Sequence, residues 1–109
     1  MTIHIEELTF KCIIGILDYE REHEQDVIIN LALDYTFYQD YINYALVANH
    51  VKTLMKDNEF LLLEDALEKI SLSLKSKYPS IEKLFLKITK PSILPDCKVS
   101  VSETYIIES

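Results

Sequence analysis

Residues 27–37, VIINLALDYTF, decide the fold that this sequence predicts. Apolar side chains occupy every second position of the stretch, at Val27, Ile29, Leu31, Leu33, Tyr35 and Phe37. The polar residues Asn30, Asp34 and Thr36 fall on alternate positions. Because successive side chains of a β-strand point to opposite faces of the sheet, this pattern predicts a long strand. One face of that strand lies on a core, and the other faces water or a neighbour.

The stretch before it, IGILDYEREHEQ at residues 14–25, holds the only glycine of the chain, Gly15. A lone glycine at the end of an apolar, strand-like run marks a sharp bend or a backbone that closely approaches another group. Four acidic side chains and Gln25 follow it. Taken alone, the segment is typical of a solvated hairpin loop. Further upstream, residues 2–13 alternate as a strand does, with a bulge expected near Glu6-Glu7.

Downstream of the long strand, the apolar residues recur at intervals of three and four instead of two. This spacing predicts an amphipathic helix over residues 43–56, with Asp40 or Asn43 as its N-terminal cap. A second amphipathic helix is predicted over residues 61–77. Pro79 ends it, because proline lacks an amide donor and restricts the residue before it.

A period of two returns at residues 84–88 and 97–102, and Pro91 and Pro95 stiffen the turn between these two strands. The order strand, strand, helix, helix, strand, strand predicts a single α+β domain over residues 1–109. Its antiparallel four-stranded sheet carries the helix pair on one face. Proteins normally cover or close the edges of their sheets. We therefore expect a ring-like oligomer that is joined through the sheet edges.

The composition argues against several classes of function. The net charge of −7 and the lack of any basic run argue against a nucleic-acid binder. No apolar stretch reaches membrane-spanning length, and the N-terminus lacks the pattern of a signal peptide. Cys12 and Cys97 have no disulfide-scaffold or CxxC spacing, which indicates reduced, partly buried thiols in a cytoplasmic protein. His4, His23 and His50 lie far apart in the sequence, so we expect no metal site.

Four residues stand out once this layout is drawn. Glu20 lies in the connection at residues 14–25, and Tyr44 begins the first predicted helix. Glu64 lies in the first turn of the second helix, and Lys90 closes the third strand. Each has a simpler interpretation: a solvated loop acid, the start of an apolar stripe, a carboxylate that favours the helix dipole, and a charge that keeps a sheet edge soluble. Taken one at a time, these simpler interpretations are the stronger ones.

Taken together, the four residues lie in segments that resemble the dihydroneopterin aldolase family, which has the tunnelling fold. The segments are IGILDYEREHEQ (14–25), DYINYALV (40–47), LLEDALEKI (62–70) and ITKP (88–91). They occur in the family's order with near-family separations, and the resemblance covers essentially the whole chain. It departs from the family in a short connection around Tyr38-Gln39-Asp40, which includes none of the four residues.

The resemblance implies a lyase of folate biosynthesis that cleaves 7,8-dihydroneopterin by a retro-aldol reaction. The products are 6-hydroxymethyl-7,8-dihydropterin and glycolaldehyde. The substrate's own ring imine accepts the electrons of the broken C–C bond, so neither a cofactor nor a metal is implied. The enzyme needs only to hold the pterin, take a proton from the side-chain hydroxyl and return one to carbon. This is general acid–base catalysis by positioned groups.

Within this reaction, the resemblance implies that Glu64 anchors the pterin. The two oxygens of a carboxylate suit the adjacent amino and ring N–H donors of a pterin edge. The backbone of Leu63 would add a contact. Lys90 is the implied general acid–base group, which acts directly or through a water molecule. Glu20 would lie beside Lys90, orient it and keep it charged.

Tyr44 and the backbone of Ile42 are implied to contact the substrate from the neighbouring subunit, with Tyr44 assisting proton transfer. In the family the pocket lies between subunits, which agrees with the open sheet edges argued above. The expected assembly is a homo-tetramer or a homo-octamer.

Several alternatives stay open at this point. A dihydroneopterin-triphosphate epimerase can share the retro-aldol intermediate, but its substrate would need basic side chains near the pocket. Residues 18–24 offer only Arg21. A non-catalytic pterin-binding protein of the same fold would bind without turnover. A Schiff base on Lys90 would follow another class of aldolases, yet dihydroneopterin offers no ketone with which the lysine could condense.

Overall fold

The computed structural model describes residues 1–38 and 40–107 of the chain. Within this part the elements follow one another as β1 (Thr2–Cys12), α1 (Asp18–Glu22), β2 (Gln25–Tyr35), α2 (Tyr44–Asn58), α3 (Leu63–Lys77), β3 (Ile81–Lys90) and β4 (Val99–Ile106). Apart from the short helix α1, this is the predicted order. The connection that departs from the family includes Gln39, which lies outside the described residues.

The strands form one antiparallel sheet in the order β1-β2-β3-β4. β2 is a central strand, and its Leu31 lies opposite Ile5 of β1 and Leu86 of β3. The register of β1 shifts between Ile5 and Leu8, and Glu7 takes a positive φ of 56°. This irregularity is the bulge expected near Glu6-Glu7. β1 and β4 remain as the two edges of the sheet.

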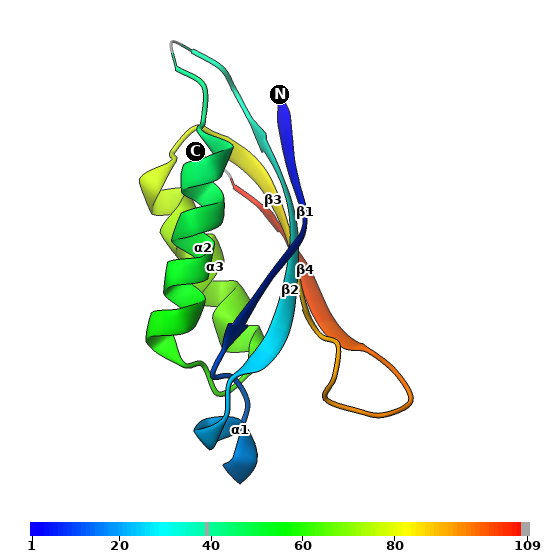
Figure 1. Ribbon diagram of the computed structural model, residues 1–109. Coiled ribbons are helices and arrows are strands. Elements are labelled where there is room, and N and C mark those ends of the chain that lie inside the picture. Colours follow the sequence, from blue (N-terminus) through cyan, green and yellow to red (C-terminus); the bar gives the residue numbers. More distant parts are fainter. Residues whose placement is uncertain (39, 108–109) are drawn as a thin grey trace.

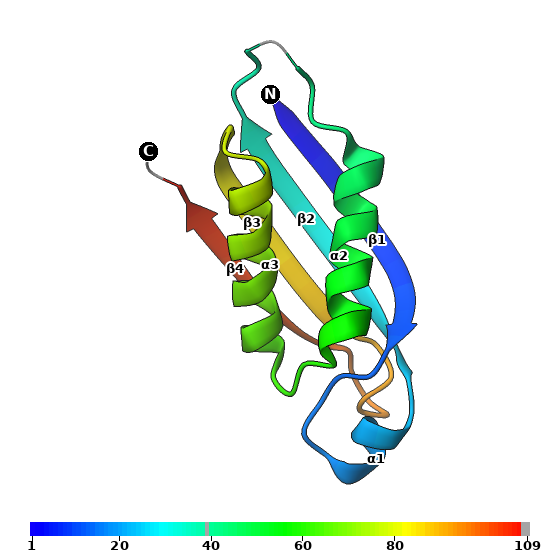
Figure 2. The same ribbon diagram turned by 90° about the vertical axis from the view of Figure 1, so that its left-hand side faces the viewer.

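The helix pair α2 and α3 covers one face of the sheet, as predicted (Figure 1). α2 packs over β1, and α3 packs over β3 and β4 (Figure 2). The core fills the space between these layers. The alternate side chains of β2 supply one side of it, and those of β3 and the apolar stripes of the helices supply the rest: Val27, Ile29, Leu31, Leu33, Leu84, Leu86, Ile88, Val47, Val51, Met55, Ala66, Leu67, Ile70 and Leu74. The predicted α+β architecture is confirmed.

The start of α2 is fixed by Asn43, one of the two predicted caps. Its side-chain oxygen accepts hydrogen bonds from the backbone N–H groups of Ala45 and Leu46, at 2.9 and 3.4 Å. The cap supplies an acceptor for the N–H of Ala45, and it shares the N–H of Leu46 with the backbone carbonyl oxygen of Asn43 at 3.1 Å. The cap therefore also sets where Tyr44 lies. None of the helices in the described ranges combines the length and the apolar character needed to cross a membrane.

The structure corrects three details of the sequence interpretation. The connection after Gly15 contains the helix α1, which is only five residues long and therefore has no apolar period. β2 ends at Tyr35, so Phe37 does not continue its core face but lies exposed and stacks on Tyr41, with 4.4 Å between ring centroids. Cys97 is exposed in the connection before β4, whereas Cys12 is buried.

We expect the substitution Asn43→Ala to lower the free energy of unfolding by about 1 kcal/mol, because it leaves the N–H of Ala45 without its side-chain acceptor. Chemical denaturation measures the change. Asn43→Asp is the matched control, since aspartate accepts the same hydrogen bonds and should stay close to the parent protein. Equal stability of the alanine variant and the parent would contradict the assigned cap.

Candidate active site

Glu20 and Lys90, 70 residues apart in the sequence, meet in a buried ion pair. Lys90 is the last residue of β3, and Glu20 lies within α1. Nζ of Lys90 donates to Oε2 of Glu20 at 2.9 Å, and the two residues are 9% and 3% exposed. A buried pair of charges is stable only when its geometry is close and further hydrogen bonds satisfy it. The structure thus brings together Lys90, the implied acid–base group, and Glu20, the residue expected to orient it.

Gln25, the first residue of β2, supplies such a further hydrogen bond. Its Nε2 donates to Oε2 of Glu20 and to the carbonyl oxygen of Ile14, both at 2.8 Å. The backbone N–H of Leu17 donates to the other carboxylate oxygen at 3.2 Å. Burial raises the pKa of Glu20, but the hydrogen bonds from Lys90, Gln25 and Leu17 and the charge of Lys90 outweigh burial and hold that pKa below its ordinary value. Glu20 is therefore a fixed anionic acceptor at neutral pH.

Gly15 leaves the room that the carboxylate of Glu20 occupies. The φ of Gly15 is 126°, in the region that favours glycine. A Cβ atom at this position would overlap with the carboxylate carbon and both carboxylate oxygens of Glu20. The close approach that the lone glycine predicted is therefore an approach to the Glu20 side chain.

The start of α3 lies at the same end of the sheet as the ion pair (Figure 2). The backbone N–H of Gly15 donates to the carbonyl oxygen of Phe60 at 3.1 Å, which bonds the connection leading into α3 to the surroundings of Glu20. Leu63 is buried at the first position of α3, whereas Glu64 is exposed. The carboxylate of Glu64 is thus accessible from solvent.

Glu64 borders an open hollow of about 580 Å³ between α3 and β4. The hollow is lined on the α3 side by Glu68, Ser71 and Leu72, and on the β4 side by residues 103–106. It opens along β4, which is an edge of the sheet. A strand of another molecule that pairs with β4 would therefore also line the hollow beside Glu64.

The other two predicted site residues, Tyr44 and Ile42, lie at the start of α2 and two residues before it. Figure 2 shows that α2 begins at the opposite end of the helix layer from the start of α3. Tyr44 is the first residue of α2 and is 67% exposed, and Ile42 is buried. α2 has 15 residues, so its first residue, Tyr44, lies roughly 22 Å from its last residue at the rise of an α-helix. The end of the fold that carries α1 is the one at which α2 finishes. Within one chain the structure does not bring Tyr44 and Ile42 to the ion pair.

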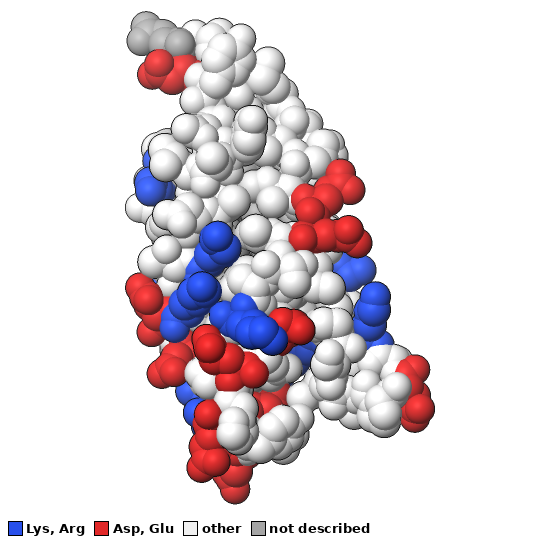
Figure 3. Space-filling model, in the orientation of Figure 1, with Lys and Arg blue, Asp and Glu red and all other residues white. Residues whose placement is uncertain are grey.

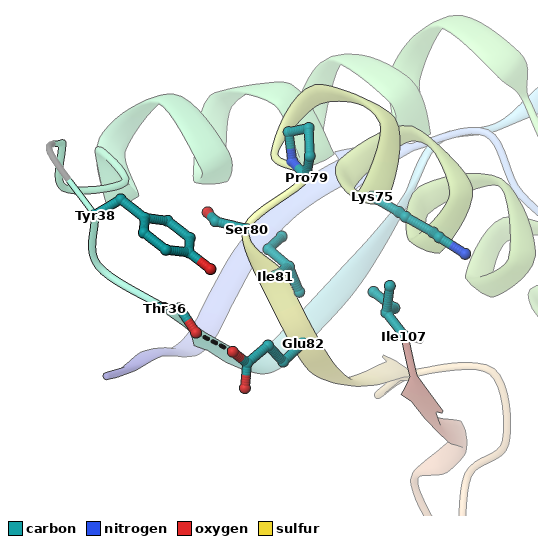
Figure 4. A pocket seen from close by; sticks show the side chains of 8 residues that line it. All are labelled: Thr36, Tyr38, Lys75, Pro79, Ser80, Ile81, Glu82 and Ile107. Carbon is teal, nitrogen blue, oxygen red and sulfur yellow. Dashed lines mark hydrogen bonds between the residues drawn. The ribbon is translucent and has the colours of Figure 1, made fainter. Parts of the chain in front are cut away.

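A separate pocket of about 340 Å³ lies where β3 begins, far from Lys90 at the end of that strand (Figure 4). The side chains of Tyr38 and Glu82 lie at one side of it and those of Lys75 and Ile107 at the other. Glu82 accepts a hydrogen bond from the hydroxyl of Thr36. None of the six predicted site residues lines this pocket.

The end of the molecule that carries α1 is acidic (Figure 3). Asp18, Glu22 and Glu24 are exposed there. Burial raises the pKa of the nearby thiol of Cys12 to about 11, so this thiol is protonated at neutral pH. In the described residues, no three histidine, cysteine or acidic side chains lie so that they could hold a metal ion.

Sequence reasoning missed two residues of this site. Gln25 was counted only as a terminal amide in an acidic connection, although its side chain holds Glu20. Arg21 was considered only as a cation, although its guanidinium donates to three backbone carbonyl groups. Composition is the signal that could have found Arg21, because it is the only arginine among eleven basic residues. Gln25, the first residue of β2, has no comparable signal in the sequence.

Comparison with known proteins gives one family and one fold. Residues 3–104 match the model of the family FolB, dihydroneopterin aldolase. The dihydroneopterin aldolase of Haemophilus influenzae is 26% identical over 104 residues, which cover 88% of this chain and 87% of that protein.

Two solved structures have nearly the same fold. The FolB protein of Vibrio cholerae superposes with a TM-score of 0.89 at 22% identity, over 98% of each chain. The dihydroneopterin aldolase of E. coli, solved in complex with neopterin, superposes with a TM-score of 0.85 at 21% identity, over 96% of this chain and 98% of that one. These similarities extend over the whole sheet and both long helices.

We expect Gly15→Ala to displace the carboxylate of Glu20 from Lys90, because the new Cβ would occupy its place. The positive φ alone should cost about 1–3 kcal/mol of stability. Denaturation measures that loss, and a crystal structure of the variant reports the Glu20–Lys90 distance. Glu22→Ala is the control, because Glu22 is exposed in α1, the helix that carries Glu20. It should alter the free energy of unfolding by less than about 0.5 kcal/mol. A Gly15→Ala variant that keeps the ion pair at its present distance would contradict this account.

Proposed function

This chain belongs to the dihydroneopterin aldolase family, as its match over residues 3–104 shows, and on that premise we propose how its residues act. It is a lyase of folate biosynthesis that cleaves 7,8-dihydroneopterin into 6-hydroxymethyl-7,8-dihydropterin and glycolaldehyde. The observation that carries our assignment of residues is the buried ion pair of Glu20 and Lys90, which lies at the end of the sheet where α3 begins.

Glu64 binds the pterin edge in this proposal, and the backbone of Leu63 adds a contact. The exposure of the Glu64 carboxylate and the open hollow beside it support this role. A carboxylate has two acceptor oxygens and pairs with the amino group and the ring N–H of a pterin. Both residues begin α3, whose N-terminus lies at the end of the sheet where Lys90 ends β3.

Lys90 transfers the protons of the reaction, directly or through a water molecule. As an ammonium, Lys90 donates a proton to the ring imine nitrogen, while a water molecule takes the proton of the substrate's side-chain hydroxyl. The C–C bond breaks, and its electron pair moves into the protonated imine. A proton returned to carbon, with the ring nitrogen giving its proton back to Lys90, completes the product. Glu20 accepts one N–H of the Lys90 ammonium, and an ammonium has three. Its other N–H groups can point to substrate while the buried carboxylate keeps the ammonium oriented.

In this proposal Tyr44 and the backbone of Ile42 contact the substrate from the neighbouring subunit of a homo-tetramer or homo-octamer. The two edges β1 and β4 support this arrangement, because α2 packs over β1 and α3 over β4. Joining β1 of one copy to β4 of the next would place α2 of the first copy beside the hollow at Glu64 of the second. The strands must be offset along their length for Tyr44 to reach that hollow, and closing a sheet into a ring requires such an offset.

The cytoplasm is the proposed location, which the unpaired thiols of Cys12 and Cys97 support. The epimerase remains the second candidate, with a triphosphate as substrate. The structure disfavours it, since Arg21 already donates to three carbonyl groups and Asp18 and Glu22 are exposed beside it. A non-catalytic pterin-binding protein is the third candidate.

We expect the purified protein to cleave 7,8-dihydroneopterin, and Lys90→Ala and Glu20→Ala to lower kcat/KM by at least about 100-fold, because each removes part of the proton-transfer pair. Chromatography with fluorescence detection of 6-hydroxymethyl-7,8-dihydropterin measures the rates. Lys83→Ala, which removes an exposed lysine from the same strand, is the matched control and should retain activity.

Dihydroneopterin triphosphate assayed in parallel separates the candidates. Faster turnover of the triphosphate would favour the epimerase. Binding of neopterin without turnover of either compound would favour the binding protein. Full activity of Lys90→Ala would show that another group transfers the proton.

We also expect inactive Tyr44→Ala and inactive Lys90→Ala subunits to complement each other when they are unfolded together and refolded. Some interfaces of the mixed oligomer then combine an intact Lys90 with an intact Tyr44 from the next copy. Activity above the sum of the separately refolded variants is the expected result. Activity equal to that sum would contradict a site shared between subunits.

A further inference from the structure

Arg21, the only arginine of the chain, follows Glu20 in α1 and reaches across to the connection between α2 and α3. Its Nη1 donates to the carbonyl oxygens of Gly15 at 3.0 Å and of Phe60 at 3.2 Å. Its Nη2 donates to the carbonyl oxygen of Glu59 at 2.8 Å. One guanidinium therefore binds the backbone on both sides of the gap between α1 and the helix pair.

The two backbone segments that Arg21 joins carry the two halves of the proposed site. Gly15 leaves room for the carboxylate of Glu20, the partner of Lys90, because a Cβ atom at this position would overlap with it. Glu59 and Phe60 begin the short connection that leads into α3 and Glu64. The only direct backbone bond described between these segments, within residues 1–38 and 40–107, runs from the Gly15 N–H to the Phe60 carbonyl oxygen at 3.1 Å. The carbonyl of Phe60 thus accepts from both Gly15 and Arg21.

Arginine is suited to this position where lysine is not. α2 ends at Asn58, and the residue that caps it, Glu59, has a positive φ of 45° although it is not a glycine. The carbonyl groups at a helix C-terminus lack partners within the helix and carry its partial negative charge. A planar guanidinium can donate at fixed angles to several carbonyl oxygens, here those of Glu59 and Phe60 directly after α2 and that of Gly15 opposite them, whereas an ammonium is a point donor on a flexible stem. The other ten basic residues of the chain are lysines, so arginine occurs only where a fork of donors is used.

We propose that Arg21 is a positioning residue, which holds the acid–base pair Glu20–Lys90 at a fixed distance from the pterin anchor Glu64. This inference rests on the proposed function, because it states what keeps the two halves of that site in register. Arg21 touches neither the substrate nor the reacting atoms in this account. Its role is exerted through the carbonyl groups of Gly15, Glu59 and Phe60.

The consequence is specific for turnover. Without Arg21 the pterin can still bind to Glu64, but the proton-transfer pair is no longer held against it. A misplacement of about 1 Å can cost 100-fold in rate. We therefore expect Arg21→Ala and Arg21→Lys to lower kcat by at least about tenfold. The dissociation constant of neopterin should change by less than about threefold, because the groups that bind the pterin remain. Lys69→Ala, which removes an exposed cation from α3, should leave both quantities at the parent values.

The single glycine gives a second readout that does not need activity. Protein labelled with ¹⁵N-glycine has one glycine amide signal, that of Gly15, whose N–H forms the bond to Phe60. We expect the amide of Gly15 to exchange with solvent faster in both Arg21 variants than in Lys69→Ala. Millimolar guanidinium ion should partly restore kcat to Arg21→Ala but not to Arg21→Lys, whose side chain fills the space.

Each result has one meaning. Parent-like kcat and Gly15 exchange in the Arg21 variants would overturn the inference. So would a joint loss of kcat, neopterin binding and thermal stability that guanidinium ion does not reverse, because that pattern describes general loosening of the fold. A parent protein that does not cleave 7,8-dihydroneopterin would instead overturn the proposed function, and the Gly15 signal would still report whether Arg21 joins the two segments.

Discussion

A carboxylate and an ammonium buried together must be held by more than their mutual attraction, because the cost of removing both from water is large. In this protein the pair is Glu20 and Lys90, and the surrounding structure supplies what the pair needs. Gln25 and the Leu17 N–H donate two further hydrogen bonds to the carboxylate. Gly15 gives it space that any side chain would take. The sequence of residues 14–25 follows from these requirements more than from helix or strand preference.

The ion pair lies apart from the hydrophobic core that stabilises the fold. The sheet and the two long helices form an apolar core, and the buried charged residues in the described part of the chain are Glu20 and Lys90. The pair lies at one end of this core, where β3 ends and α3 begins. At the other end α2 begins with the exposed Tyr44. A single chain thus holds the two parts of the proposed site at opposite ends, which is why we propose that the site is shared between copies.

The fold could be predicted from the sequence because periodicity reports burial, which is a local property of each element. The alternation of β2 and the stripes of α2 and α3 are clear for that reason. α1 could not be predicted, since it is held by the hydrogen bonds of Glu20 rather than by an apolar face. The prediction that Phe37 belongs to the strand was wrong. The alternation of apolar residues continues to Phe37, although β2 and its pairing with the neighbouring strands end at Tyr35. The contact between Glu20 and Lys90 could be predicted only from the family resemblance. The two residues are 70 positions apart, and periodicity reports only on neighbours within one helix or strand.

The bulge in β1 affects whether copies of the chain can add to one another as a fibre. A contact between two different edges, such as β1 and β4, is heterologous, so it either closes on itself or continues as a filament. At the bulge Glu7 has a positive φ, and its N–H is bound by the side chain of Asn30 instead of continuing the ladder. Bulges bend and twist a strand, and the exposed carboxylates of Glu6 and Glu7 resist a copy that adds out of register. The interruption of β1 therefore opposes the growth of fibres from a sheet whose edges are otherwise open.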